Sequence, residues 1–296
     1  MRVFQRYSKN SVRALLLAFF LGMIIFLGVS SGEEVSHFPS EDLSRLGWAH
    51  YDEGGFSLAE DLFLQALAKD PRSLSALTGL GWTYLDSERY EDAEFSFLQA
   101  LQLDSRNEDA LLGLGWVYYD LEKYEQGSSA FETLVLADPQ FSRAWGGWGW
   151  CILERGEPSM AQAIFERGLA LDEGDGDLWN GLGWSLYDQE LYAEALEAFR
   201  QGVYHAPRDP YPLNGLGWTL LELERCEEAE EAFVRVREMD PSLRDSLLGL
   251  AHARFHQGKH EAARDLYEEV LLLAPDNEEA LEGLERIRLL GKESVH

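Results

Sequence analysis

Pairs of a tryptophan and an acidic residue recur along the chain, with the acid four residues after the indole. That separation stacks the two side chains on one face of a helix. Six such pairs occur: Trp48/Asp52, Trp82/Asp86, Trp116/Asp120, Trp150/Glu154, Trp184/Asp188 and Trp218/Glu222. An indole face attracts cations and stacks on flat apolar groups, and a nearby carboxylate adds charge complementarity. These pairs therefore predict a ligand-binding surface.

Asn180 and Asn214 extend this candidate surface, because each lies one helical turn before the tryptophan of a pair. Their amides can hydrogen-bond the backbone of an extended segment. Further along the chain, His252 and His256 take the places of the tryptophan and the acid. Two histidines one turn apart can chelate a transition metal, so they are a weak candidate metal site. The plainer interpretation is a pair of exposed imidazoles, and no cofactor is expected.

Nothing in the sequence resembles a catalytic constellation. It contains no nucleophile elbow, no phosphate-binding loop and no HExxH motif. Cys151 and Cys226 lack the basic neighbours that would activate a thiolate. The acidic run over 172–177 does not match a calcium-binding loop, because Gly174 occupies a ligand position. We therefore expect a protein that is not an enzyme.

A period of 34 residues positions the tryptophan–acid pairs. The tripeptide Leu-Gly-Trp begins at residues 46, 80, 114, 182 and 216, and altered forms continue the same frame at 148, 250 and 284. Thirteen residues after each of the first seven positions stands alanine or glycine, and four residues later stands phenylalanine or tyrosine. No insertion or deletion interrupts the series, which predicts a repeat protein.

Each repeat contains two amphipathic helices. In the second repeat, the apolar stripe of the first helix is Leu77, Leu80, Gly81 and Tyr84, and that of the second helix is Ala93, Phe97, Ala100 and Leu101. Such spacings are typical of helices with one buried face. Residues 87–89 are the predicted turn between the two helices. One helix pair cannot bury its apolar face alone, so neighbouring pairs are expected to stack.

This pattern resembles the tetratricopeptide repeat, which has Leu-Gly, Tyr, Ala, Phe and Pro at these places. The resemblance implies an all-α, right-handed superhelical solenoid of seven helical hairpins with a C-terminal capping helix. It also implies that the indole–carboxylate face of the first helices lines a concave groove for a protein partner. The family commonly has asparagine where this chain has tryptophan, so the groove is expected to select its ligand by indole and carboxylate chemistry.

The repeat frame divides the chain. Seven repeats are predicted over 40–277, at 40–73, 74–107, 108–141, 142–175, 176–209, 210–243 and 244–277. Residues 278–296 are the expected capping helix and tail, because Glu285 and Arg286 replace the Gly-Trp of the repeats. Residues 1–32 are the expected signal peptide, and residues 33–39 are a linker.

The N-terminal segment predicts export from the cytoplasm. The stretch from Ala14 to Val29 has no polar side chain and follows a basic stretch, and small residues around Gly32 suit cleavage. An uncleaved membrane anchor is the alternative. From Glu33 onward the net charge is −32, which disfavours nucleic acid and anionic lipid and favours cationic partners. We expect a periplasmic or secreted protein that contacts the membrane only through an uncleaved N-terminal segment.

The tryptophans also have a structural interpretation. A repeated indole can be buried between adjacent first helices, and the acids can be an ordinary solvated face. Glycines at 79, 113, 147, 181 and 215 lie three residues before an indole. Because helical side chains lean toward the N-terminus, we expect these glycines to let the ring lie flat with one face free.

The leading hypothesis is a non-enzymatic binding or scaffold protein of the periplasm or cell envelope. It would hold an extended, basic or aromatic polypeptide segment in the groove and support the assembly of a complex. The alternative is a glycan-binding protein of polysaccharide export or envelope maintenance, with indole faces against sugar rings. The third hypothesis is a purely structural stack that uses its outer surface.

Overall fold

The computed structural model describes residues 38–293, and within that range the chain forms fifteen α-helices and no strand. The expected signal peptide over 1–32 and most of the linker lie outside the described residues. None of the described helices is both long and apolar enough to cross a membrane. The helices form two compact units, which divide between Ala137 and Asp138.

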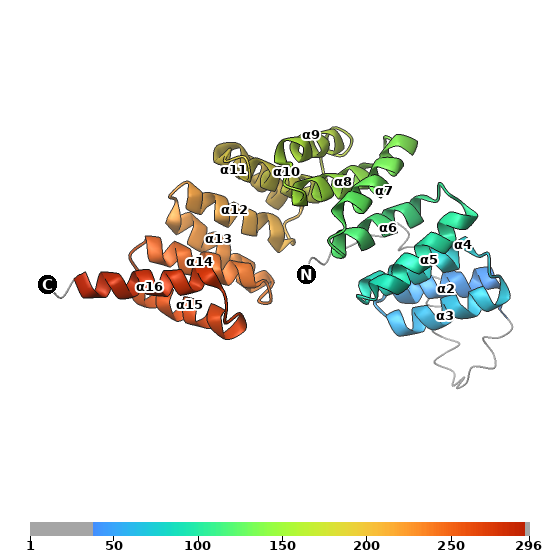
Figure 1. Cartoon of the computed structure of the whole chain (residues 1–296), viewed down its shortest axis with the longest axis horizontal. Helices are drawn as coiled ribbons and strands as arrows, with labels where there is room; N and C mark the ends of the chain where they lie inside the picture. Colours follow the sequence, from blue (N-terminus) through green and yellow to red (C-terminus); the bar gives the residue numbers. More distant parts are fainter. Residues whose placement is uncertain (1–37, 294–296) are drawn as a thin grey trace. The chain divides into compact units, whose positions relative to one another are not determined.

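The first unit contains three helical hairpins (Figure 1). They are α2 (Ser40–Asp52) with α3 (Phe56–Lys69), α4 (Leu74–Asp86) with α5 (Tyr90–Leu103), and α6 (Glu108–Asp120) with α7 (Tyr124–Ala137). Each first helix packs on its own second helix, and α4 also packs on α2 and on α6. The predicted stacking of helix pairs is confirmed.

The second unit contains four hairpins and a last single helix (Figure 1). They are α8 (Ser142–Glu154) with α9 (Pro158–Leu169), α10 (Gly176–Tyr187) with α11 (Tyr192–His205), α12 (Pro210–Glu222) with α13 (Cys226–Met239), α14 (Arg244–His256) with α15 (His260–Leu273), and α16 (Glu278–Glu293). The all-α fold of helical hairpins predicted from the sequence is confirmed.

Side-chain caps start several of the first helices. The side chains of Ser73, Asn107, Asp175 and Asp209 each accept a hydrogen bond from a backbone N–H of the following first turn. Asp175, which belongs to the acidic run over 172–177, accepts from the backbone N–H groups of Asp177 and Leu178 at 2.9 and 3.2 Å. This carboxylate therefore begins a helix, as acidic N-caps do.

The turn inside every hairpin has one residue in the left-handed region of backbone space. It is glycine at Gly54, Gly156 and Gly258, with φ of 76–77°, and glutamate at Glu88, Glu122, Glu190 and Glu224, with φ of 58–61°. The left-handed conformation costs an L-residue about 1 kcal/mol. Helix pairing offsets that cost in the four hairpins with glutamate.

A phenylalanine between two glycines is the repeated unit of the core. Phe97 is fully buried, and a Cβ added at Gly81 of its own hairpin or at Gly113 of the next would lie 2.5 or 2.1 Å from its ring. The same arrangement surrounds Phe63, Phe165, Phe199 and Phe233. The expectation that Gly79, Gly113, Gly181 and Gly215 lie beneath the indoles was therefore wrong, because these glycines make room for the phenylalanine of the preceding hairpin.

Helix α16 packs on α15 at the end of the second unit. Gly283 meets the ring of Tyr267 as the repeat glycines meet phenylalanine, and Leu284 and Ile287 pack against the core below. Arg288 Nε donates to Glu285 Oε2 at 2.6 Å, and Glu285 stands where the first six repeats have glycine. Since this pair is charged, it ends the apolar stack.

Candidate functional site

The tryptophans of the six pairs all pack in the same way. Each indole meets the core phenylalanine of its own hairpin edge to face, with ring centroids 5.2–5.5 Å apart and ring planes 71–79° apart. Such T-shaped contacts are a favoured aromatic geometry. Trp48, Trp82 and Trp116 form a row in the first unit, and Trp150, Trp184 and Trp218 form a row in the second.

The indoles differ in depth, while the acids do not. Trp82 and Trp150 are buried, with 5% and 3% of their surface exposed, and Trp48, Trp116, Trp184 and Trp218 are partly exposed. Asp52, Asp86, Asp120, Glu154, Asp188 and Glu222 are all exposed. For Trp82 and Trp150 the structure favours the packing interpretation. A ligand can reach the other four indoles and the carboxylates.

Tyrosines of alternate repeats bond to acids of the following repeat. The hydroxyl of Tyr51 donates to Asp86, and the hydroxyl of Tyr187 donates to Glu222 at 3.2 Å. Burial and the charge of Glu222 raise the pKa of Tyr187, so its phenol stays a neutral donor. Trp48 and Trp184 in turn pack edge-on against Tyr51 and Tyr187, with centroids 5.3 Å apart in both pairs.

Two indole N–H groups bond to the next first helix, a contact that the sequence interpretation missed. Trp48 Nε1 donates to Ser75 Oγ at 3.1 Å, and Trp218 Nε1 donates to Asp245 Oδ2 at 2.8 Å. Both acceptors lie 27 residues after the indole. This separation is seven residues less than the 34-residue period, so each acceptor lies about two turns earlier in the next first helix than the tryptophan does in its own. The sequence could therefore have revealed this contact between consecutive first helices.

Asn180 and Asn214 lie deeper than expected, with 7% and 5% of their surface exposed. Asn214 Nδ2 donates to Asp245 Oδ2 at 2.7 Å, so this carboxylate holds both Asn214 and Trp218. The Oδ1 atoms of both asparagines are buried and have no hydrogen-bond partner in the part of the chain that the structure describes. A buried unpaired acceptor costs about 1–3 kcal/mol, which an incoming N–H donor would remove.

The electrostatics of these rows oppose further negative charge. Burial raises the pKa of Asp52, and burial followed by repulsion from Glu154 raises the pKa of Asp188. In the first turn of α10, burial together with repulsion from Asp175 and Asp209 raises the pKa of Asp177 to about 7. A carboxyl whose pKa is raised by neighbouring carboxylates gains from a bound cation.

Comparison with sequence families decides what this repeat is. A tetratricopeptide repeat profile matches residues 44–110, 153–211 and 214–278, and a second tetratricopeptide repeat profile matches residues 85–147. The matches to the first profile alone cover more than half of the chain. The chain belongs to the tetratricopeptide repeat family. No curated protein sequence matches it significantly.

Solved structures share the fold. A tetratricopeptide repeat protein from Parabacteroides merdae is 19% identical, with a TM-score of 0.66 over 84% of this chain and 98% of that chain. The pilF protein of Pseudomonas aeruginosa is 20% identical, with a TM-score of 0.60 over 73% and 97%. PilW, a type IV pilus biogenesis factor, is 21% identical, with a TM-score of 0.64 over 71% and 98%. At these identities the likeness shows the fold alone.

The seventh tetratricopeptide repeat keeps the packing of the rows with other residues. His252 meets the ring of Tyr267 edge to face at 5.5 Å and lies 3.3 Å from Glu279 on α16. Burial lowers the pKa of His252, although Glu279 opposes that shift. His256, the other residue of the weak metal candidate, is exposed. Over residues 38–293, no group of three or more histidine, cysteine, aspartate or glutamate side chains is placed to hold a metal ion.

Both cysteines of this tetratricopeptide chain are free thiols. Cys151 is fully buried in α8, and burial followed by repulsion from Glu154 raises its thiol pKa to about 12. Cys226 begins α13, is partly exposed, and has a thiol pKa raised by burial and by Glu227. Neither thiol is in the electropositive setting of a reactive cysteine.

Proposed function

We propose that this tetratricopeptide protein is a non-enzymatic scaffold that holds an extended basic or aromatic polypeptide segment against its tryptophan–acid rows. In each unit, lysine or arginine side chains of the segment pair with the exposed carboxylates, and its aromatic or basic groups lie on the partly exposed indoles. The bound segment joins its parent protein to a larger complex. The proposed location is the periplasm or cell envelope, reached through the N-terminal segment.

The exposed carboxylate of Asp188 carries this proposal. The carboxylate of Asp188 has no hydrogen bond or ion pair with any residue of 38–293, and burial and Glu154 raise its pKa. It lies one turn after Trp184, whose ring is partly exposed. A cation placed between the carboxylate and the indole would relieve the repulsion and gain a cation–π contact of about 0.5–1 kcal/mol.

Two further observations support the scaffold role. The repeats occupy residues 40–277 by their sequence period, and the shared fold includes a protein characterised as a pilus biogenesis factor, which acts in an assembly process. The N-terminal apolar stretch supports the location outside the cytoplasm.

The test measures binding of a fluorescein-labelled dodecapeptide that alternates lysine, tyrosine and serine, by fluorescence anisotropy with the full chain. We expect binding that weakens at least tenfold between low salt and about 0.5 M salt, because the contacts are exposed charges. Asp188→Asn/Glu222→Gln should weaken binding about tenfold, which equals about 1.4 kcal/mol. The matched control is Asp172→Asn/Glu173→Gln, which removes the same charge from an exposed turn away from the rows.

Equal binding by the row variant and the control variant would refute the proposed site. The same titration with neutral and amine-bearing oligosaccharides separates the glycan hypothesis, because a neutral sugar complex should not weaken in salt. The glycan hypothesis requires open indole faces, which buried Trp82 and Trp150 do not offer. Oligosaccharide binding without peptide binding would therefore overturn the proposal.

A further inference from the structure

In the first unit, a glutamate, a tyrosine and a basic residue lie together between consecutive second helices. We call each such cluster a clasp. In the clasp between α3 and α5, burial and then Glu60 of α3 raise the pKa of Tyr84 of α4 to about 12. Arg89 donates to Glu60 at 2.9 Å and places its guanidinium 4.2 Å from the centre of the Tyr84 ring. The side chains of a tyrosine, a glutamate and an arginine therefore lie together between α3 and α5.

Related clasps lie at equivalent positions of two other hairpins, and in the last of them Arg254 replaces the tyrosine. Tyr118 donates to Glu94 at 3.0 Å, and Lys123 lies 3.8 Å from the same carboxylate. Before the last hairpin, Arg254 and Lys259 donate to Glu230 at 3.0 and 2.7 Å. Although partial burial opposes the charge of Glu230, hydrogen bonds from Lys259, Gln257 and Arg254 lower its pKa to about 2.

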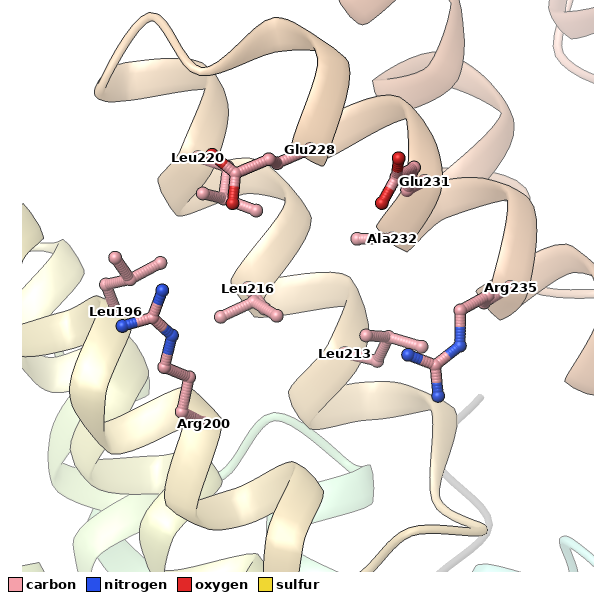
Figure 2. A pocket seen from close by; sticks show the side chains of 9 residues that line it. All are labelled: Leu196, Arg200, Leu213, Leu216, Leu220, Glu228, Glu231, Ala232 and Arg235. Carbon is pink, nitrogen blue, oxygen red and sulfur yellow. The ribbon is translucent and has the colours of Figure 1, made fainter.

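Between α11 and α13 the clasp is missing, because leucines replace two of its three members. Leu196 stands at the position of Glu60, Glu94 and Glu230, and Leu220 stands at the position of Tyr84 and Tyr118. Arg225, the basic residue at the clasp position, forms an ion pair instead with Glu228 of α13, at 2.6 Å. A groove of about 210 Å³ opens there (Figure 2). Its floor is a stripe of α12, formed by Leu213, Leu216 and Leu220.

Two arginines border this groove from opposite walls (Figure 2). Arg200 extends from α11 and Arg235 from α13. Arg235 forms no ion pair with any residue of 38–293. Arg200 approaches Glu197 at 3.9 Å, and after Arg225 its charge also helps to lower the pKa of Glu228. Of the acids on the α13 wall, Glu228 is held by Arg225, while Glu231 lies one turn before Arg235. The groove therefore offers an apolar floor and two available guanidinium groups in a chain of net charge −28.

We propose that the groove between α11 and α13 is a second docking site, which takes a large apolar side chain from an acidic segment of a partner protein. The groove of about 210 Å³ is open to solvent, and Leu216 on its floor is partly exposed, so a leucine or phenylalanine side chain can lie against it. Carboxylates beside that side chain would pair with Arg200 and Arg235, and arginine suits carboxylates because its donors form a planar fork.

This docking site is independent of the tryptophan–acid rows. On α12, Trp218 follows Leu216 by two residues, which places the indole about 200° around the helix from the groove floor. The rows favour a basic or aromatic segment, and the groove favours an acidic and apolar one. One chain can therefore hold two segments of opposite charge at the same time.

The test uses the full chain and a fluorescein-labelled peptide in which a Leu-Phe pair is flanked by two aspartates on each side. Two matched peptides replace Leu-Phe by Ala-Ala, or the aspartates by lysines. In fluorescence anisotropy, we expect the parent peptide to bind at least tenfold more tightly than either matched peptide. Glu231→Gln should tighten binding two- to threefold, because it removes a negative charge from the groove wall.

One double variant fills the groove, and a second double variant reverses the charge of its two arginines. Leu196→Glu/Leu220→Tyr rebuilds the clasp seen between α3 and α5, with Arg225 as its base, and should weaken binding at least tenfold while the protein stays folded. Arg200→Glu/Arg235→Glu changes only surface charges and should have the same effect. The charge-matched control, Arg72→Glu/Arg264→Glu, alters exposed arginines elsewhere and should bind as the parent does. Circular dichroism melting confirms that each variant folds.

Absence of peptide binding up to about 1 mM, the weak limit of specific recognition, would overturn the proposal. Unchanged affinity in both groove variants would overturn it as well. Loss of binding in Asp188→Asn/Glu222→Gln with the groove variants unaffected would assign the peptide to the rows instead. Because the two sites use peptides of opposite charge, failure here leaves the test of the rows unaffected.

Discussion

Replacing Gly215 by alanine tests the packing that orients the tryptophan–acid face. A Cβ at this position would lie 2.3 Å from the ring of Phe199, whereas carbon atoms in contact lie about 3.5–4.0 Å apart. The ring would have to retreat by more than about 1 Å. It cannot do so freely, because Gly183 lies against its other side, where an added Cβ would lie 2.6 Å away.

The size of the effect follows from two opposing contributions. Overpacking of a buried site costs about 1–3 kcal/mol. Alanine gains about 1 kcal/mol over glycine in a helix interior. Gly215→Ala should therefore lower the free energy of unfolding by up to about 2 kcal/mol. The control is Gly146→Ala in α8, where the Cβ would lie 3.2 Å from the flexible end of Leu178 and the gain in helix propensity should dominate.

The assay is urea denaturation followed by circular dichroism of the helices. Since repeat arrays can unfold in more than one step, the transitions of both variants are compared with that of the parent under one set of conditions. A second comparison introduces Gly215→Ala into a Phe199→Leu background, where the smaller side chain should make the alanine harmless. If Gly215→Ala stabilises the parent as much as Gly146→Ala does, the phenylalanine–glycine packing is not what limits these positions.

Three further predictions concern single side chains of the second unit. Ionisation of Asp177 opposes folding above its unfolded pKa of about 3.9 and reaches its full effect above its folded pKa of about 7. Asp177→Asn should therefore raise the melting temperature at pH 8 and leave it unchanged at pH 3.5. An equal shift at both pH values would contradict the assignment. Native protein should react with a thiol reagent at Cys226 and not at Cys151, and both should react in urea; labelling of native Cys151 would show that α8 opens. Trp218→Phe removes the hydrogen bond to Asp245 and should cost about 1 kcal/mol in urea denaturation, whereas no loss would mean that water replaces the indole N–H.

The helices were predictable because their signals are local. Helix α4 ends at Asp86 and α5 begins at Tyr90, on either side of the turn predicted over 87–89. The apolar stripe and the turn residues lie within a few residues of one another, so the chain near them specifies the helix directly. The recurrence of the same signals every 34 residues then predicts the stacking.

The roles of the glycines were not predictable from a single helix. Gly113 lies three residues before Trp116, and helix geometry alone suggested that the indole covers it. In the structure it is the ring of Phe97, from the preceding hairpin, that would lie 2.1 Å from a Cβ at this position. Which ring reaches a glycine depends on how two hairpins pack, and the spacing within one helix does not specify that.

The period, the helices, the turns and the placing of an indole and an acid on one helix face can all be read from the order of the residues. The tertiary structure alone decided that Trp82 and Trp150 are buried, that Asn180 and Asn214 keep unpaired oxygens, and that leucines leave a groove beside α12. The physical reason is distance along the chain. Helical order arises within one turn, whereas burial and cavities arise where side chains about one repeat apart do or do not fill the same space.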